Sequence, residues 1–428
     1  MTFSAVCVMV LYVNWDGFAD AWYWMARLEP PGTPNLDRLV AGGTVLTRHF
    51  CGIPAITNPM QQTLVSGAWP QKTGNCYRYF DRETRRVVQT GRLNPCETIA
   101  EAAVRRGLAC ASVHGWYEEC RGCTPGDVRN PYIAEPALRN FEGRVQLLLD
   151  YLDGKPVPSG GKTVTMQRRP DYMTLYADDI DTVCHNGVRL PYAQLRRART
   201  LEEWYGNLRY TVQRMDRALG RLMDIPGVTL ALAADHGGMP YGAAGFGVDA
   251  AEAARPRLPE LLKAIREGGI RVAVVESNQE DIPADAQAAL VVLETQAQLT
   301  WLQPVDECRQ RAVCERMLSL PFVRAVLDQR AQRDWGAWAG MCDLFIATRP
   351  PYCLRHDDDS AFVGGSHAAL EDTVLRPFCA FWGAGIRRGH ALRERTSLID
   401  FAPTVCRLLG IEGPRDADGR VLTEVLEG

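Results

Sequence analysis

One stretch of the sequence reads Cys51-Gly52-Ile53-Pro54-Ala55-Ile56-Thr57-Asn58-Pro59, and apolar residues follow it at helical spacing as far as Gly67. This pattern predicts a helix that begins at Thr57 and ends at Gly67. A hydroxyl in the first turn lies where free N–H groups and the helix dipole favour anions. Thr57 is therefore either a capping residue or a nucleophile, and a threonine nucleophile needs a base, a cation or a metal beside it.

Length, charge and hydropathy limit the class of protein. With 428 residues, the chain is long enough for one large α/β domain with an insertion, or for two or three ordinary domains. A net charge of −3 and the lack of a long basic run argue against a nucleic-acid polymer as partner, but not against a single nucleotide. No apolar run reaches the length of a membrane span, so we expect no membrane partner.

Two features bear on the cellular compartment. The apolar residues 5–13 have no basic region before them, so they predict a buried strand rather than a signal peptide. The 14 cysteines are scattered along the chain, which fits reduced thiols in the cytoplasm better than a disulfide scaffold. Cys120 and Cys123 form an isolated C-x-x-C motif, which is either an ordinary loop or a metal or redox site.

Acidic and imidazole side chains follow two predicted buried strands. Residues 5–15 run into Asp16, and residues 229–234 run into Asp235-His236, which two glycines follow. Open α/β sheets bind ligands beyond the carboxyl ends of their strands, and buried ionisable groups need partners. We therefore expect ligands at both strand ends, with surface turns as the alternative.

Two further positions carry residue types of the same kind. Asp181 and His185 follow the predicted strand at residues 171–177 and lie four residues apart, a spacing that places both on one face of a helical turn. His367 lies in a glycine-rich loop much later in the chain. Taken alone, the first two are a surface pair or ligands, and His367 is a surface residue or a ligand.

These positions together supply three carboxylates, three imidazoles and one hydroxyl, at Asp16, Asp181, Asp235, His185, His236, His367 and Thr57. Oxygen and nitrogen ligands in these numbers suit two borderline cations such as Zn²⁺, with manganese as the alternative. Two neighbouring cations can hold both the attacking and the leaving oxygen of an in-line phosphoryl transfer. The sequence therefore predicts a two-metal site for phosphoryl transfer.

The pattern of predicted elements changes after residue 246. Helical segments at residues 258–267 and 305–318 alternate with short strands at 270–275 and 289–293. This alternation predicts an inserted α+β cap over residues 247–338. Residues 343–347 form a predicted strand that we expect to return to the core.

The ordered set of motifs resembles the alkaline phosphatase superfamily, and specifically its nucleotide pyrophosphatase/phosphodiesterase branch. That branch has a strand ending in Asp-Gly, a Pro-Asn-Leu-Asp helix, a nucleophilic Thr, an Asp-x-x-x-His pair, an Asp-His-Gly and a late Gly-x-His, and this chain has all of them in that order. Thr57-Asn58-Pro59 and residues 79–84 are most similar to phosphonoacetate hydrolase. The resemblance implies a three-layer αβα alkaline-phosphatase-like core over residues 1–246 and 339–428.

The resemblance also implies a role for each motif. Asp181, His185 and His367 would hold one metal, and the second would be held by Asp16, Asp235 and His236. Thr57 would attack phosphorus and form a phospho-threonine. We therefore expect a metal-dependent hydrolase of small phosphate esters or related phosphoryl and phosphonate compounds, with a C–P bond hydrolase or a non-catalytic metal-binding module of the same fold as alternatives.

The sequence departs from the resemblance in three places. Phosphonoacetate hydrolase has substrate-binding lysines after the strand that matches residues 108–113, whereas this chain has His114 there and no lysine. The branch has a phosphoryl-binding Asn about twenty residues after the nucleophile, and here Arg78 lies near that place, with Asn75 three residues earlier. Arg78, Asn75 and His114 are accordingly candidate substrate contacts. Aromatic residues crowd the first metal loop, as core or as a pocket lining: Trp15, Phe18, Trp22, Tyr23 and Trp24.

Two other enzyme classes of the superfamily fit the sequence less well. A sulfatase needs Cys or Ser in the motif C/S-x-P-x-R, whereas after Cys51 the proline comes one residue late and the arginine is missing. A phosphoglycerate mutase uses serine where this chain has Thr57. The natural substrate and the oligomeric state are not encoded in a readable motif.

Overall fold

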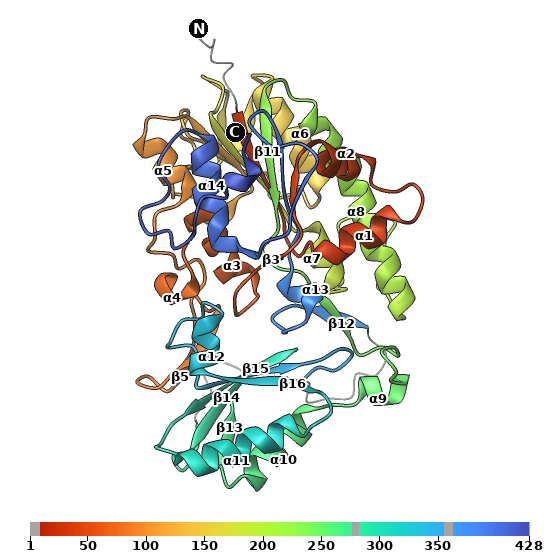
Figure 1. The fold of residues 1–428 in the computed structure, drawn as a ribbon, viewed down its shortest axis with the longest axis vertical. Coiled ribbons are helices and arrows are strands. Elements are labelled where there is room, and N and C mark those ends of the chain that lie inside the picture. Colours follow the sequence, from red (N-terminus) through yellow and green to blue (C-terminus); the bar gives the residue numbers. More distant parts are fainter. Residues whose placement is uncertain (1–8, 276–281, 355–362, 428) are drawn as a thin grey trace.

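The structure is a computed structural model, and it describes residues 9–275, 282–354 and 363–427. Its largest element is a sheet of eight strands in the order β20-β2-β19-β11-β1-β10-β6-β7 (Figure 1). Three parallel strands lie at its centre: β1 (Met9–Trp15), β10 (Tyr172–Ala177) and β11 (Val228–Ala233). Each is buried along its whole length, which explains their nearly continuous apolar sequence.

Helices cover both faces of this sheet. Alternate residues of β1 face opposite sides, so that Leu11 and Val13 join one apolar cluster while Val10 and Tyr12 join another. The first cluster includes buried residues of α1 (Asp20–Arg27), α2 (Pro34–Gly42), α6 (Phe141–Leu152), α7 (Asp179–Cys184) and α8 (Leu201–Met223). The second includes residues of α3 (Thr57–Ser66), α5 (Ile99–Arg105) and α14 (Phe401–Leu408). The predicted three-layer αβα core is confirmed.

The outer strands of the main sheet and several small elements complete the core. The outer strands are β2 (Thr44–Leu46), β6 (Cys110–Val113), β7 (Tyr132–Ile133), β19 (Cys379–Gly383) and β20 (His390–Leu392). Small pairs are β3 (His49–Phe50) with β21 (Thr396–Ser397), β4 (Arg78–Asp81) with β5 (Arg86–Gln89), β8 (Val157–Ser159) with β9 (Lys162–Val164), and β12 (Met239–Tyr241) with β18 (Gly364–Ser366). Short helices are α4 (Pro70–Thr73) and α13 (Asp372–Leu375), whereas α9 (Ala250–Ala254) and α12 (Gln329–Asp334) lie within the predicted cap residues 247–338.

A second, five-stranded sheet lies at one end of the molecule (Figure 1). Its order is β13-β14-β15-β17-β16, formed by β13 (Val272–Val274), β14 (Ala288–Leu293), β15 (Gln296–Trp301), β17 (Leu344–Thr348) and β16 (Val323–Asp328). The helices α10 (Leu258–Glu267) and α11 (Glu307–Leu318) share an apolar cluster with these strands. The smaller α+β part that the sequence predicts is therefore present.

One prediction about this region is wrong. The sequence predicts that residues 343–347 return the chain to the core, but β17 pairs with β15 and β16 and so belongs to the second sheet. The error has a physical cause, because an apolar run indicates a buried strand without indicating which sheet buries it. The chain therefore leaves the second sheet only after Thr348.

The remaining local predictions agree with the structure to within a few residues. The helix predicted from Thr57 is α3, and Gly67 ends it in a left-handed conformation with φ of 69°. Asp181 lies in α7 and His185 caps the end of this helix, where the His185 N–H donates to the Asp181 carbonyl oxygen. The start of the first predicted strand, residues 5–8, lies outside the described residues.

Candidate active site

The central parallel strands bring the acidic motifs together at one edge of the sheet. Asp16 follows β1, Asp235 and His236 follow β11, and Asp181 lies in the helix that follows β10. Gly17, with φ of 75°, lets the loop after β1 pass close to Asp181, since a Cβ on Gly17 would come within 3.1 Å of the Asp181 backbone. The topology thus places three carboxylates side by side.

Asp16, Asp235 and His236 form a fully buried group. One oxygen of Asp235, Oδ1, accepts backbone hydrogen bonds from Gly17 (3.2 Å) and His236 (3.0 Å), and its other oxygen lies 3.4 Å from His236 Nε2. Asp16 Oδ1 lies 3.5 Å from the same nitrogen, and Asp16 Oδ2 accepts a hydrogen bond from Tyr176 at 2.5 Å. One ligand atom from each of the three residues therefore faces a common point, and these atoms lie within 4.8 Å of one another.

The ring of His236 is held in one orientation. Its Nδ1 lies 2.9 Å from the Gly237 carbonyl oxygen, which can only accept, so Nδ1 carries the proton. Its Nε2 is then free to accept, and the Thr57 hydroxyl lies 3.2 Å away. A Cβ on Gly237 would lie 1.9 Å from the Thr373 carbonyl oxygen, so only glycine fits beside this histidine.

Asp181, His185 and His367 lie next to this group. The Oδ1 atom of Asp181 is 3.5 Å from His185 Nε2 and 3.9 Å from His367 Nε2. The rings of His185 and His367 meet edge to face at 5.0 Å, and His367 lies 4.2 Å from the ring of His236. Asp181, His236 and His367 have ligand atoms within 4.8 Å of one another, so His236 stands between the two groups.

The electrostatics of the cluster show why it fits cations. Burial raises the pKa of Asp16, and the neighbouring charges of Asp235 and Asp181 raise it further. Burial lowers the pKa of His367, and the nearby His236 and His185 lower it further, so this imidazole is neutral and can bind a metal.

Buried carboxylate oxygens without hydrogen-bond donors also indicate that the cluster fits cations. Asp16 Oδ1, Asp181 Oδ1 and Asp235 Oδ2 are buried and have no hydrogen-bond partner in the described part of the chain. Buried acceptors without donors are costly, and a divalent cation satisfies several of them at once. The donor set of carboxylates and imidazoles fits two such ions.

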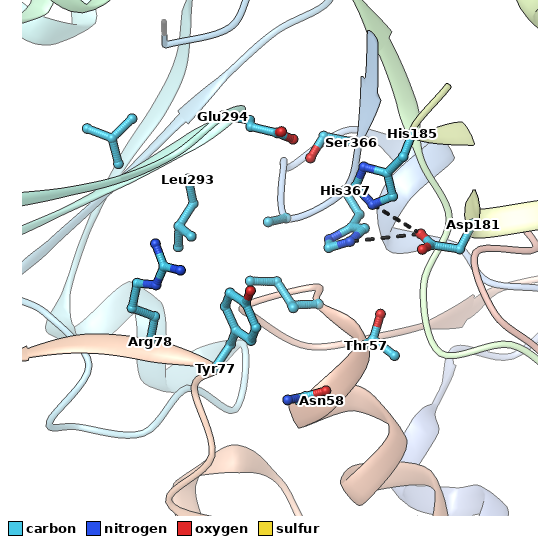
Figure 2. A pocket seen from close by; sticks show the side chains of 13 residues that line it. Thr57, Asn58, Tyr77, Arg78, Asp181, His185, Leu293, Glu294, Ser366 and His367 are labelled. Carbon is cyan, nitrogen blue, oxygen red and sulfur yellow. Dashed lines mark ion pairs between the residues drawn. The ribbon is translucent and has the colours of Figure 1, made fainter. Parts of the chain in front are cut away.

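Thr57 is the first residue of α3, after the N-cap residue Ile56, and the Thr57 hydroxyl pairs with His236 Nε2 at 3.2 Å. Its hydroxyl is therefore not consumed by the helix and points into a cavity of about 440 Å³ (Figure 2). The cavity walls come from Thr57, Asn58, Tyr77 and Arg78 on one side and from Asp181, His185, Ser366 and His367 on the other. The turn between β14 and β15 closes it with Val292, Leu293 and Glu294, so the second sheet contributes to the site.

The predicted substrate contacts are placed differently from one another. Arg78 lines the cavity, and its guanidinium lies 5.6 Å from the centre of the Tyr77 ring. Asn75 is buried behind the wall, where its amide nitrogen donates to the carbonyl oxygens of Gly91 and Leu93 at 3.1 and 2.9 Å. His114 is not among the residues that line the cavity, and its Nε2 accepts a hydrogen bond from the Glu135 N–H at 3.1 Å.

The aromatic residues near the first metal loop are mostly core. Trp15, Phe18, Trp22 and Tyr23 are at most 2% exposed, whereas Trp24 is 46% exposed. None of them lines the cavity. The structure thus favours the core alternative for this cluster.

Three parts of the site have no counterpart among the predicted contacts: Tyr77, Tyr176 and the turn at residues 292–294. Tyr77 adjoins Arg78, so its position in the sequence could have suggested it. Tyr176 precedes Asp178 by two residues and is a typical strand residue, and the turn at 292–294 carries no motif. Only the tertiary structure identifies the last two.

In the ranges that the structure describes, no helix combines the length and apolar character needed to span a bilayer. The cysteines of these ranges are free, with Cys120 exposed and Cys123 buried.

Comparison with protein families gives one broad match. Residues 10–362 match the family described as type I phosphodiesterase / nucleotide pyrophosphatase. Among curated proteins, steryl-sulfatase from Mus musculus is 24% identical over 430 residues, which cover 92% of this chain. The chain spans 61% of the length of that relative.

Solved structures of similar fold include ectonucleotide pyrophosphatase / phosphodiesterase 5 from two mammals. The murine protein has a TM-score of 0.64 at 14% identity, and the human protein has 0.63 at 16%. An inactive murine variant, in which alanine replaces a threonine, was solved with AMP and has a TM-score of 0.66 at 15% identity. Each comparison covers 98% of this chain and 100% of the other, so the fold is shared over the whole length.

Proposed function

Because the chain belongs to the type I phosphodiesterase / nucleotide pyrophosphatase family, a branch of the alkaline phosphatase superfamily whose chemistry is phosphoester hydrolysis, we propose that it is a two-metal hydrolase with Thr57 as its nucleophile. One observation carries this proposal. The Thr57 hydroxyl and the six acidic and imidazole side chains lie around one point at the edge of the main sheet, although they come from segments spread over more than three hundred residues.

Six side chains would hold the cations. Asp16, Asp235 and His236 would hold one, and the second would be held by Asp181, His185 and His367, with zinc as the proposed metal and manganese as the alternative. When bound, two divalent cations lower the pKa of a hydroxyl and neutralise charge on the phosphoryl group.

The residues of the chain position the reaction itself. The Thr57 hydroxyl lies 3.2 Å from His236 Nε2, the atom through which His236 would hold its cation, and the first turn of α3 directs backbone N–H groups toward an anion. In the proposed first step, Thr57 Oγ1 loses its proton and bonds to phosphorus while the bond to the leaving oxygen breaks, which gives a phospho-threonine and an alcohol whose oxygen takes up a proton. Water then displaces Thr57 and releases phosphate or a phosphomonoester. The threonine-to-alanine change in the inactive murine relative supports this role for Thr57.

The substrate that we propose is a small phosphoester, with nucleotides among the candidates. A cavity of about 440 Å³ has room for a compound of that size. The AMP complex of the murine relative supports nucleotides. Arg78 supports recognition of a negatively charged group, because its Nε is buried and has no hydrogen-bond partner among the described residues.

Two finer proposals concern the rest of the molecule. We propose that residues 247–338 together with β17 act as a cap on the core, since the β14–β15 turn reaches the cavity. Free cysteines support the cytoplasm as the proposed compartment. We do not propose C–P bond hydrolysis of phosphonoacetate, because His114 and the residues that follow it add no cation to the cavity wall.

The test compares wild type with Thr57→Ala and Thr57→Ser. Each protein is loaded with Zn²⁺ or Mn²⁺ and assayed with p-nitrophenyl monoesters and diesters, nucleotides and phosphonates. We expect wild type to be active and, when quenched during turnover, to carry a phosphoryl group on Thr57 detectable by mass spectrometry; Thr57→Ala should have no turnover, and Thr57→Ser, which keeps a hydroxyl, should keep part of it. The fold should survive, because the Thr57 side chain is small and Ile56 is the N-cap of α3, so the loss of stability should not exceed that of a helix cap, about 1 kcal/mol. Wild-type kcat in Thr57→Ala would remove Thr57 from the nucleophile role.

A further inference from the structure

Tyr77 has a backbone conformation that its side chain disfavours. Its φ is 68°, in the left-handed region that glycine and asparagine occupy more easily than a bulky aromatic residue. Residues held in such conformations concentrate at binding and catalytic sites, where the surrounding structure enforces them. The strained backbone of Tyr77 therefore needs a structural cause and indicates a role in binding or catalysis.

The cause is the buried amide of Asn75. Its Oδ1 accepts the Tyr77 N–H at 3.0 Å and the Thr90 hydroxyl at 2.7 Å, and its Nδ2 is held by the two carbonyl oxygens of the opposite loop. The Tyr77 carbonyl oxygen accepts the Thr90 N–H at 2.9 Å. Both backbone polar groups of Tyr77 are thus fixed, and Asn75 is the positioning residue.

The role of Tyr77 follows from the direction of its side chain. The Tyr77 hydroxyl points into the same cavity as the Thr57 hydroxyl, with Glu294 and Ser366 on the opposite wall (Figure 2). The ring also lies beneath the Arg78 guanidinium, 5.6 Å from it. Arg78 and Tyr77 therefore follow one another along the wall, with Tyr77 on the side of Thr57 (Figure 2).

We propose that Tyr77 is a catalytic residue whose hydroxyl donates a hydrogen bond to a non-bridging oxygen of the phosphoryl group that Thr57 attacks. This proposal rests on the proposed function. A phenol O–H is a neutral donor, and a hydrogen bond from such a donor to an anionic oxygen is stronger than one between neutral groups. Tyr77 keeps its proton throughout, and no bond to it forms or breaks.

A fixed donor is useful here because the charge on the phosphoryl oxygens shifts as the attacking bond forms. A donor that is already oriented stabilises that charge without reorganisation. The strained backbone supplies the orientation, because an extended residue at this position would direct its side chain differently. The cation of Arg78 then remains available for a second charged group of the substrate.

A ring substitution separates this role from packing. Tyr77→Phe keeps the ring, its contact with Arg78 and the backbone, and removes only the hydroxyl. We expect kcat/KM for a p-nitrophenyl ester to fall at least tenfold, as it does for other oriented donors, with an unchanged unfolding temperature. Inhibition by vanadate, which mimics the five-coordinate state, should weaken by a similar factor, and inhibition by phosphate should weaken less.

Tyr79→Phe is the matched control. Tyr79 lies on β4 of the same hairpin, packs edge to face against Trp338 at 4.9 Å, and is not a cavity residue. We expect its kcat/KM and its vanadate inhibition to equal those of wild type.

The possible results separate the two proposals. An active wild type with equal kcat/KM and equal vanadate inhibition in Tyr77→Phe overturns the role of Tyr77 and leaves the proposed function standing. A metal-loaded wild type that hydrolyses no ester and binds no vanadate overturns both.

Discussion

The hydroxyl of Tyr176 donates a hydrogen bond to Oδ2 of Asp16 across two neighbouring strands, at a distance of 2.5 Å. The two side chains are buried, and the Tyr176 ring is fixed by edge-to-face contacts with Trp116 and Tyr117. This bond fixes the plane of the Asp16 carboxylate and leaves Oδ1 directed at His236. A partner of this kind orients a ligand without touching the metal.

We predict that Tyr176→Phe weakens metal binding while the fold is kept. Asp16 would lose the donor that orients it, and loss of such a partner typically lowers metal affinity by roughly 10–100-fold. Titration of metal-free protein with Zn²⁺ against a competing chelator measures this directly. Tyr117→Phe removes a hydroxyl from the ring 5.9 Å away and should leave the affinity unchanged. Equal affinities in wild type and Tyr176→Phe would show that Asp16 needs no such partner.

Much of the core could be predicted because its signals are local. The helix from Thr57 to Gly67 has regular apolar spacing and a glycine at its end, and both limits agree with α3. The central strands are continuous apolar runs that stop abruptly at a charged residue, so their ends and the residues beyond them are visible in the sequence.

The second sheet was only partly predictable. Strand β15 alternates polar and apolar residues, which indicates a strand with one face in solvent, yet its polar residues Gln296, Gln298 and Thr300 are buried. The sequence predicts strand β17 but not the sheet to which it belongs, because strand partners are a tertiary property. The left-handed Tyr77 depends on the amide of Asn75, and no propensity favours that conformation in tyrosine.

We predict that the chain binds two divalent cations and that they stabilise it. Elemental analysis of protein purified without chelator should give well over one metal per chain. Removal with a strong chelator should abolish turnover and lower the unfolding temperature, because a ligand at a hundred times its Kd stabilises the native state by about 2.7 kcal/mol.

Two histidine variants, one in the site and one outside it, make this test of metal binding more specific. His367→Ala should lower the metal content, because His367 lies between Asp181 and His236. His390→Ala changes a histidine on the edge strand β20 and should leave the content unchanged. A metal-free protein with full activity after chelation would contradict the two-metal mechanism.

We predict that Arg78 sets the preference for charge on the substrate. Arg78→Ala should reduce kcat/KM for a monoester more than for a diester, because a monoester carries the additional charge. The difference should be about 1.5–3 kcal/mol, the size of a hydrogen bond to a charged group. Arg86→Ala, an exposed arginine on β5 of the same hairpin, is the control. Equal losses of kcat/KM for the monoester and the diester would mean that Arg78 does not distinguish substrates by charge. Fast cleavage of phosphonoacetate would show that binding of its carboxylate does not require a lysine.

The last prediction concerns Glu118, a buried carboxyl group on the face of the sheet that α3 and α5 cover. Its oxygens accept hydrogen bonds from Tyr172 at 2.9 Å and from Thr174 at 2.5 Å. Burial raises the pKa of Glu118 from 4.5 to about 7, although these two hydrogen bonds oppose the shift. Between pH 4.5 and 7 the folded chain therefore holds a proton that the unfolded chain has released.

Stability must fall as pH rises through this window, because the native state binds more protons there than the unfolded state does. A shift from 4.5 to about 7 corresponds to about 3 kcal/mol, which is fully present below pH 4.5 and lost above pH 7. Glu118→Gln keeps the shape without the titration, so its urea midpoint should fall less than that of wild type between pH 5 and 8. Glu119→Gln, which loses only the exposed pair with Arg92, should follow wild type. Parallel pH profiles for wild type and Glu118→Gln would show that Glu118 titrates near its ordinary pKa in the folded chain.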